Sequence, residues 1–376
     1  MVNFLDSFLS IFSKQTSNSV VGVDIGSSSI KVVELKKRKE KAILQTYGEI
    51  ALGPYTSVEV GQSTKLDPSK ISEALVDVLK EANTSTSSSA IAIPMSSSMV
   101  SIFRMPKMND KQLGQMIPVE SRKYIPVPIS EVTLDWFVIP TTKNDDQEEV
   151  QEKPKKVTPK DFIEVMVVAI HNDVLSNINN IVGSTTLTPS FFEVEMFSTI
   201  RSTIDSVDNA SVMIVDIGAA ATKVYISERG IIRDSHIISR GSQRITQNLV
   251  QTLNIEFSHA EQLKRNYGRN NEAHDNALTD AIAWVIDPLF SDIKNIISRF
   301  QLKNNKVVSK IVFVGGGSLL SGLTEKAQTK LNTEAVVGDP FLKVETPAFL
   351  ADILKETGAN FSVALGLALR KLQELE

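Results

Sequence analysis

The chain has 376 residues, of which 42% are hydrophobic and 22% charged, and its formal net charge is −4 with an isoelectric point near 5.8. This length favours two lobes, each with its own core, and the lack of a basic surplus argues against a nucleic-acid partner. Cysteine is absent, which excludes disulfides and thiolate metal sites and suits the cytoplasm, and no apolar run is long enough to predict a membrane span.

The N-terminal segment, residues 1–19, is amphipathic. Its large apolar residues recur at helical spacing: Phe4, Leu5, Phe8, Leu9 and Phe12. The segment lacks the positive n-region and the cleavage site of a signal peptide. It could lie on a membrane, dock on a partner, pack on its own domain or be frayed. Lys14 is its one basic residue, fewer than interfacial helices usually carry.

The first structured stretch is predicted to be a β-hairpin. The apolar run before Asp24 is short and rich in β-branched valine, as in a strand buried on both faces, and residues 30–35 favour a strand again. Rossmann folds and P-loops place a helix after their glycines, whereas a strand follows Gly26 here. We therefore expect a hairpin whose turn directs backbone N–H groups outward.

Further elements follow in the first half of the chain. We expect a strand at 42–50, a helix at 68–82 capped by Asp67, and strands at 90–94 and 99–105. Residues 104–190 then predict a small α+β insertion. It comprises a helix at 110–124 kinked by Pro118, strands at 132–139 and 162–170, and a helix at 173–182. The charged stretch 143–160 is either an exposed loop or an electrostatic docking tail.

The opening motif returns after residue 210. A predicted strand at 211–215 enters Asp216-Ile217-Gly218, and aligning Asp24 on Asp216 also places Gly26 on Gly218 and Lys31 on Lys223. The remaining predicted elements are helices at 242–253, 258–267, 276–300 (interrupted by Pro288) and 323–331, and a strand at 311–314 before Gly315-Gly316-Gly317.

Two such hairpins would present backbone donors to a chain of phosphates. Carboxylates beside phosphates repel, since two like charges 4 Å apart cost about 4 kcal/mol at an effective dielectric of 20, so Mg²⁺ is expected, held by Asp24 and Asp216 through water. Asp216 could also assist catalysis through a metal-bound water. The phosphate-binding candidates are Asp24, Gly26, Ser27, Ser28, Ser29, Lys31, Asp216, Gly218, Ala219 and Thr222.

The third glycine cluster, Gly315, Gly316 and Gly317 with Ser318, would let a nucleoside approach the backbone, and the helix after it would point its N-terminus at the ligand. Each glycine turn taken singly is equally consistent with an ordinary tight turn.

With these motifs in place, the sequence resembles the actin superfamily, an α/β fold of two lobes built from duplicated ribonuclease-H-like domains. Residues 20–35 and 216–224 are similar to its two phosphate motifs, and residues 313–323 to its adenosine motif. Within it, residues 117–132 and 364–370 resemble the FtsA-related, PilM-type family of type IV pilus assembly proteins. The likeness spans about 20–371.

The resemblance implies four subdomains: 1A (20–103 and about 345–376), 1C (104–190), 2A (191–240 and about 301–344) and 2B (241–300). It implies ATP and Mg²⁺ as ligands, with Glu261 and Lys264 near the nucleoside; a solvated helical pair is the alternative for these two residues. It also implies that the N-terminal peptide of a PilN-type inner-membrane protein docks between 1A and 1C. Peripheral membrane association through that partner, contacts with other pilus platform and motor proteins, and homo-oligomerisation are further implications.

Arg122, Tyr124 and Ile125 are partner-binding candidates, although residues such as Tyr124 and Ile125 are more often core residues at this spacing. No Gln or His is placed to orient an attacking water, so we expect slow hydrolysis at most. The leading hypothesis is a nucleotide-gated adaptor. The alternatives are a kinase or phosphatase of the same superfamily, and an FtsA-like filament protein; the short charged C-terminus argues against the latter.

Overall fold

The computed structural model describes residues 18–140, 162–205, 210–267 and 276–374. Contacts divide these residues into two compact units, 95–179 and the remainder, and each unit is described by itself. The expected charged loop at 143–160 and the amphipathic residues 1–17 lie outside the described residues. The four subdomain boundaries stay a prediction.

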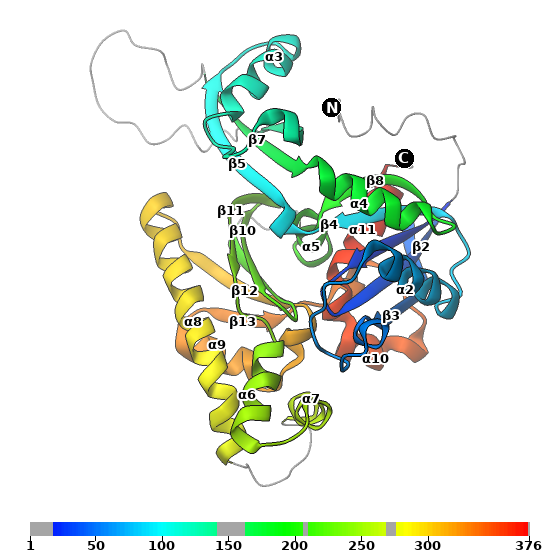
Figure 1. Cartoon of the computed structure of the whole chain (residues 1–376). Helices are drawn as coiled ribbons and strands as arrows, with labels where there is room; N and C mark the ends of the chain where they lie inside the picture. The colour runs from blue at the N-terminus through cyan, green and yellow to red at the C-terminus, as the bar shows by residue number, and fades with distance from the viewer. Residues whose placement is uncertain (1–17, 141–161, 206–209, 268–275, 375–376) are drawn as a thin grey trace. The chain divides into compact units, whose positions relative to one another are not determined.

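The larger unit contains two five-stranded sheets of the same topology (Figure 1). The first sheet has the order β3 (Lys41–Ala51), β2 (Ser29–Arg38), β1 (Ser19–Ile25), β4 (Ser88–Ile93) and β8 (Thr188–Val194). The second has the order β11 (Ile231–Ile238), β10 (Thr222–Glu228), β9 (Ser211–Ile217), β12 (Val308–Val314) and β13 (Glu334–Val337). In each, three antiparallel strands are followed by two parallel ones. The repeated motif therefore reflects a repeated sheet.

The helices of this unit include the crossover segments that parallel strands require. They are α2 (Pro68–Glu81), the end of α4 (Asn172–Gly183), α5 (Glu195–Thr203), α6 (Gln243–Leu253), α7 (Phe257–Asn266), α8 (Asn276–Asn304), α9 (Leu323–Leu331), α10 (Ala351–Thr357) and α11 (Ser362–Gln373). Asp67 is the N-cap of α2, as predicted, and Pro68 is its first residue, but the Asp67 side chain makes no capping hydrogen bond. The position of the cap was right and its expected chemistry was wrong.

Helix α8 continues through Pro288, which corrects the predicted interruption. Proline removes the hydrogen bond to the carbonyl of Trp284. Both Trp284 and Pro288 are exposed, so water can hydrate that carbonyl. Val285 and Leu289, on the other face of the helix, are buried. Burial of this face holds the helix together across the proline.

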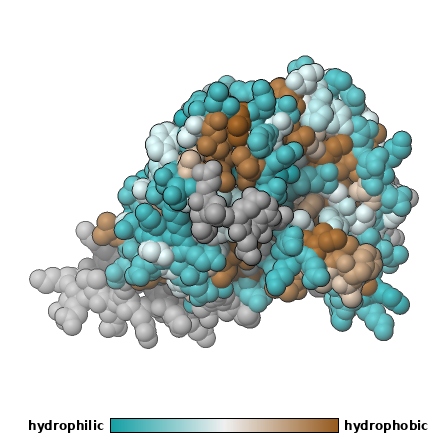
Figure 2. Space-filling model, turned by 90° about the horizontal axis from the view of Figure 1, so that it is seen from below, coloured by the Kyte–Doolittle hydropathy of each residue, from teal (hydrophilic) through white to brown (hydrophobic). Residues whose placement is uncertain are grey.

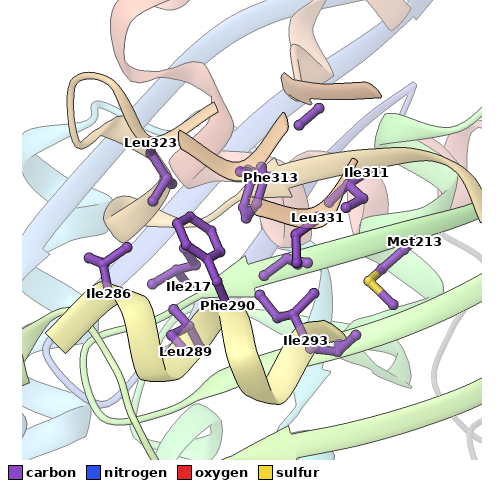
Figure 3. Packing of buried hydrophobic residues seen from close by; sticks show 14 of the residues in the cluster. Met213, Ile217, Ile286, Leu289, Phe290, Ile293, Ile311, Phe313, Leu323 and Leu331 are labelled. Carbon is purple, nitrogen blue, oxygen red and sulfur yellow. The ribbon is translucent and has the colours of Figure 1, made fainter. Parts of the chain in front are cut away.

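The core of the second sheet lies between α8 and the strands (Figure 3). Ile286, Phe290 and Ile293 of α8 point toward Ile217 and Phe313 of β9 and β12, and all five belong to one buried cluster. Burying each such side chain contributes about 1.5–3 kcal/mol. This packing fixes the strand ends that carry Asp216 and the glycines after Val314.

The smaller unit is built on a three-stranded antiparallel sheet. Its order is β5 (Ser98–Pro106), β7 (Phe162–His171) and β6 (Val132–Ile139), and it is covered by α3 (Asp110–Ser121). The predicted helix–strand–strand–helix pattern is confirmed, with β5 as a further strand of the same sheet. The capping box of Asn109 and Gln112 begins α3, and Pro118 lies inside it.

The face of the molecule drawn in Figure 2 shows hydrophilic residues interrupted by separate apolar patches. Among the described residues, no helix is both long and apolar enough to cross a membrane.

Candidate functional site: two matched hairpins and a buried acidic cluster

The two predicted hairpins form with the same pairing. Asp24 lies opposite Lys31 in β1 and β2, and Asp216 lies opposite Lys223 in β9 and β10. Each turn is closed by one backbone hydrogen bond of 3.0 Å, from Gly26 N to Ser29 O and from Gly218 N to Ala221 O. The register read from the sequence is therefore confirmed.

The turn geometry decides which amides are left for a ligand. The N–H groups of Gly26 and Gly218 are used inside the turns, so their role is to shape the turn. Within the described chain, no intramolecular acceptor is present for the amides at the turn tips, those of Ser27, Ser28, Ala219 and Ala220. These amides are the donors that fit an anion.

Glu195, which the sequence did not indicate, lies at the centre of the site. It is the first residue of α5, it is 4% exposed, and its carboxylate accepts from Lys223 Nζ at 2.6 Å. Lys223 Nζ also lies 3.4 Å from Asp216 Oδ2. Burial raises the pKa of Glu195, Lys223 opposes this, and the negative charges of Asp216 and Asp24 raise it further. The Lys223 pKa is raised because Glu195, Asp216 and Asp24 outweigh its burial.

Asp24 belongs to the same electrostatic cluster. Its desolvation raises the pKa of this carboxyl, Lys31 and Lys223 lower it, and the charges of Asp216 and Glu49 raise it again. Lys31 Nζ donates to Ser29 Oγ at 3.0 Å and lies 3.7 Å from Glu49. The carboxylates in this cluster thus outnumber the lysines.

The third glycine cluster touches the second hairpin. Gly315 has a φ of +78°, and a Cβ there would come within 2.3 Å of Asp216 Oδ1, so glycine is required. A 3₁₀ turn, Gly316–Leu319, follows at once, and Ser318 Oγ donates to Gly315 O at 2.7 Å. Helix α9 follows and begins at Leu323, as predicted.

Glu261 and Lys264 form a second buried cluster. Glu261 accepts from Lys264 at 2.6 Å, from Thr246 at 2.7 Å and from Arg265 at 2.9 Å. These partners outweigh its burial and lower its pKa, whereas burial lowers the pKa of Lys264. The pair is therefore more than a solvated helical pair.

A loop joins this second cluster to the first hairpin. A Cβ on Gly61, whose φ is +92°, would come within 2.7 Å of the Glu261 carboxyl carbon. Three residues on, Thr64 N donates to Ser27 O at 2.8 Å. Between them, Ser63 N donates to Gln243 Oε1. The loop thus connects a phosphate-binding candidate with the nucleoside-binding candidates.

The remaining candidates lie as follows. Thr222 Oγ1 is buried and donates to Arg240 O at 2.7 Å, so its proton is already engaged. In the smaller unit, Arg122 is exposed, Tyr124 is 46% exposed and stacks on Phe103 with 4.8 Å between ring centroids, and Ile125 is buried. Ile125 therefore supports the core, as its alternative interpretation held.

A direct protein cage for a metal is not formed. Among the described residues, no group of three or more His, Cys, Asp or Glu is placed to hold an ion. The acidic cluster nevertheless fits a cation that keeps its own waters, since Asp24, Asp216 and Glu195 carry more charge than Lys31 and Lys223 neutralise. An open groove of about 550 Å³ lies elsewhere, between β11 and α8, lined by His236 and Arg299 among others.

Comparison with known proteins places this geometry in a family. The family model of the type IV pilus assembly protein PilM matches residues 22–372. The solved PilM-PilN type IV pilus biogenesis complex has a TM-score of 0.76 and 24% identity, covering 94% of this chain and 98% of that chain. The ethanolamine utilization protein EutJ from Carboxydothermus hydrogenoformans has a TM-score of 0.54 and 14% identity, covering 97% and 95%.

Curated relatives include the cell division protein FtsA. That of Staphylococcus epidermidis is 24% identical over 162 residues, 37% of this chain and 34% of the relative, and that of Buchnera aphidicola is 22% identical over 205 residues, 47% and 48%. The chain thus matches a third to a half of the length of these relatives. The fold is actin-like, as the duplicated sheets and the structural neighbours show. The chain belongs to the family of the type IV pilus assembly protein PilM.

Proposed function

We propose that this chain is an ATP-binding adaptor of the type IV pilus assembly platform at the inner membrane. In this proposal, nucleotide controls the binding of the N-terminal peptide of a PilN-type membrane protein. The observation that supports nucleotide binding is the pair of matched hairpins, in which the amides at the turn tips are free to bind an anion. The partner half is supported by the family and by the PilM-PilN complex among the structural neighbours.

In the proposed site, the tip amides of the two turns bind phosphate oxygens, and Lys31 adds positive charge. Bound Mg²⁺ would supply the charge that lets phosphates lie beside Asp24 and Asp216, which would hold it through water. The nucleoside would lie near Gly315 and the cluster of Glu261 and Lys264.

Glu195 is the residue that we propose orients the attacking water, for which no Gln or His was found in the sequence. A buried carboxylate with a raised pKa can orient a water and accept its proton. Its oxygen is held by Lys223 at 2.6 Å, and that contact reduces its basicity. We therefore infer slow hydrolysis, consistent with nucleotide acting as a switch.

For the partner, the exposed Arg122 and Tyr124 are the proposed contacts. Arginine can bind a carboxylate or a carbonyl of a peptide, and the Tyr124 ring, stacked on Phe103, offers a rigid apolar surface.

The test is calorimetric titration of the N-terminal cytoplasmic peptide of the same organism's PilN-type protein into the full chain, with and without Mg-ATP. We expect the affinity to change at least about fivefold with nucleotide, the lower limit of a typical coupling. Combined Arg122→Ala and Tyr124→Ala should weaken binding by about tenfold or more, whereas Lys107→Ala, an exposed cation in the same unit, should not. Equal peptide affinity with and without Mg-ATP would contradict the nucleotide control. No binding of the peptide in either state would contradict the adaptor function.

A further inference from the structure

The loop after β3 begins and ends on the first phosphate-binding turn. Leu52 N donates to Ser28 O at 2.9 Å, and Thr64 N donates to Ser27 O at 2.8 Å. The Thr64 hydroxyl donates to the same Ser27 oxygen at 3.2 Å. We call residues 52–64 the strap. Both of its ends are therefore held by the turn whose tip amides are the candidates for binding phosphate.

The middle of the strap reaches helices α6 and α7. Ser63 N donates to Gln243 Oε1, at the start of α6. Gly61 lies against Glu261 of α7, so closely that a Cβ would come within 2.7 Å of the Glu261 carboxyl carbon. Three donors hold this carboxylate, so it cannot move aside without losing hydrogen bonds. The contact therefore requires glycine, as does the φ of +92° at this position.

The strap is held by hydrogen bonds more than by packing. None of residues 54–64 is buried. The start of the strap is fixed to α2, because Tyr55 Oη donates to Asp77 Oδ2 at 2.5 Å. Segments with few buried apolar contacts open at a low cost in free energy. The position of the rest of the strap, residues 57–64, therefore depends on the bonds at its middle and at its end.

A phosphate on the turn would act on the strap through one peptide group. The Ser27 carbonyl and the Ser28 N–H belong to the same peptide unit. A phosphate oxygen on Ser28 N and the Thr64 N–H on Ser27 O would therefore lie at the two ends of that unit. Hydrogen bonds in such a chain polarise and strengthen one another. A bound phosphate would thus strengthen the bond that holds the end of the strap.

We propose that the strap couples phosphate binding at the first turn to nucleoside binding beside Glu261. Thr64, Gly61 and Gln243 are positioning residues in this mechanism, because they determine where the groups around the ligand lie. The coupling rests on the proposed nucleotide site and extends it, since it gives the element through which a bound triphosphate holds α6 and α7 against the first hairpin.

The experiment is hydrogen–deuterium exchange of the full chain alone, with Mg-ATP and with magnesium tripolyphosphate, combined with calorimetry of both ligands. In the natural chain, each ligand should slow the exchange of residues 57–64 at least about fivefold, the lower limit of a typical coupling. Gly61→Ala and Gln243→Ala should each weaken ATP binding at least about fivefold. They should leave tripolyphosphate binding unchanged, because the phosphate-binding turn itself is intact.

The matched control is Gly230→Ala. Gly230 also has a positive φ, of +74°, but an added Cβ there would meet no described atom within 4 Å. This variant shares the backbone strain of Gly61→Ala without its clash, so it should bind both ligands as the natural chain does. Circular dichroism shows whether each variant is folded.

Three results would overturn the coupling and leave the nucleotide site in place. They are unchanged exchange of residues 57–64 with tripolyphosphate, unchanged ATP affinity in both Gly61→Ala and Gln243→Ala, and an equal loss of ATP and tripolyphosphate binding in both variants. A natural chain that binds no ATP would overturn the proposed nucleotide site itself, and the coupling with it.

Discussion

Glu193 and Glu195 are two buried glutamates, two residues apart at the junction of β8 and α5, and their environments are opposite. Glu193 accepts from Arg201 at 2.7 and 2.8 Å and from Arg370 at 3.0 Å, and Arg370 in turn lies over the Phe191 ring at 4.3 Å. These cations outweigh its burial and lower its pKa. Glu195 accepts from Lys223, which also lies near Asp216, and the pKa of Glu195 is raised.

This difference indicates a structural role for Glu193 and a functional role for Glu195, within one short segment. A carboxylate whose negative charge is fully compensated stabilises the fold, and here it joins β8, α5 and α11. A carboxylate in an uncompensated acidic cluster is kept at a cost in stability, which is typical of functional sites.

The largest effect is expected from Glu193→Gln. Removing this charge leaves the half-buried Arg201 without its counter-charge and Arg370 with Glu374 alone. Breaking a buried ion pair costs about 3–5 kcal/mol. Urea unfolding should show a loss of this size, with nucleotide binding retained in the folded fraction. A loss below about 1 kcal/mol would contradict the structural role.

The pH dependence provides a control for the same site. Because the folded-state pKa of Glu193 is lowered, its contribution is present above the ordinary carboxyl pKa of 4.5 and is lost as the pH falls through the lowered value. The Glu193→Gln variant should therefore lose less stability on acidification than the natural chain.

Glu195→Gln should have the opposite effect to Glu193→Gln: stability should change little and ATP hydrolysis should fall. It removes one negative charge from a cluster that holds an excess, and Lys223 keeps Asp216 as a partner, so the loss of stability should be much smaller than for Glu193→Gln. If Glu195 orients the attacking water, single-turnover ATP hydrolysis should fall by about 10²-fold or more, while ATP affinity stays the same. An unchanged hydrolysis rate would exclude this role.

The smallest effect is expected from Tyr225→Phe. The Tyr225 hydroxyl is fully buried without a hydrogen-bond partner among the described residues, and its pKa is raised by burial and by the charges of Glu195, Asp216 and Asp24. Removing an unsatisfied buried hydroxyl should leave stability unchanged or raise it by about 1 kcal/mol. A clear loss in thermal unfolding would show that the hydroxyl is bonded in solution.

The sequence could predict the hairpins because the same residue types recur at the same spacing in both strand pairs. Opposing residues in a hairpin follow from counting, so Asp24 and Lys31 could be paired before any coordinates. The sequence could also predict that the backbone at Gly315 is closely approached. It could not predict that Asp216 Oδ1 is the atom that excludes a side chain there.

Glu195 could not be found in this way. The strand before it, β8, contains Pro189 near its start and is not among the predicted elements, and its own helix, α5, has only nine residues. Glu195 reaches Lys223 because of the way α5 packs in the fold, and this packing produces no local pattern in the sequence. The one signal available was a pair of acidic residues, Glu193 and Glu195, within an otherwise apolar run.

We propose that the two hairpins bind ATP through a cation that their aspartates require. Calorimetric titration of ATP into the natural chain, Asp24→Ala and Asp216→Ala, each with and without Mg²⁺, tests it directly, with the exposed Asp110→Ala as control. We predict Mg²⁺-dependent binding for the natural chain and the control, and loss of that dependence in both site variants. Equal ATP affinity with and without Mg²⁺ in the natural chain, or an unchanged dependence in both variants, would contradict the account.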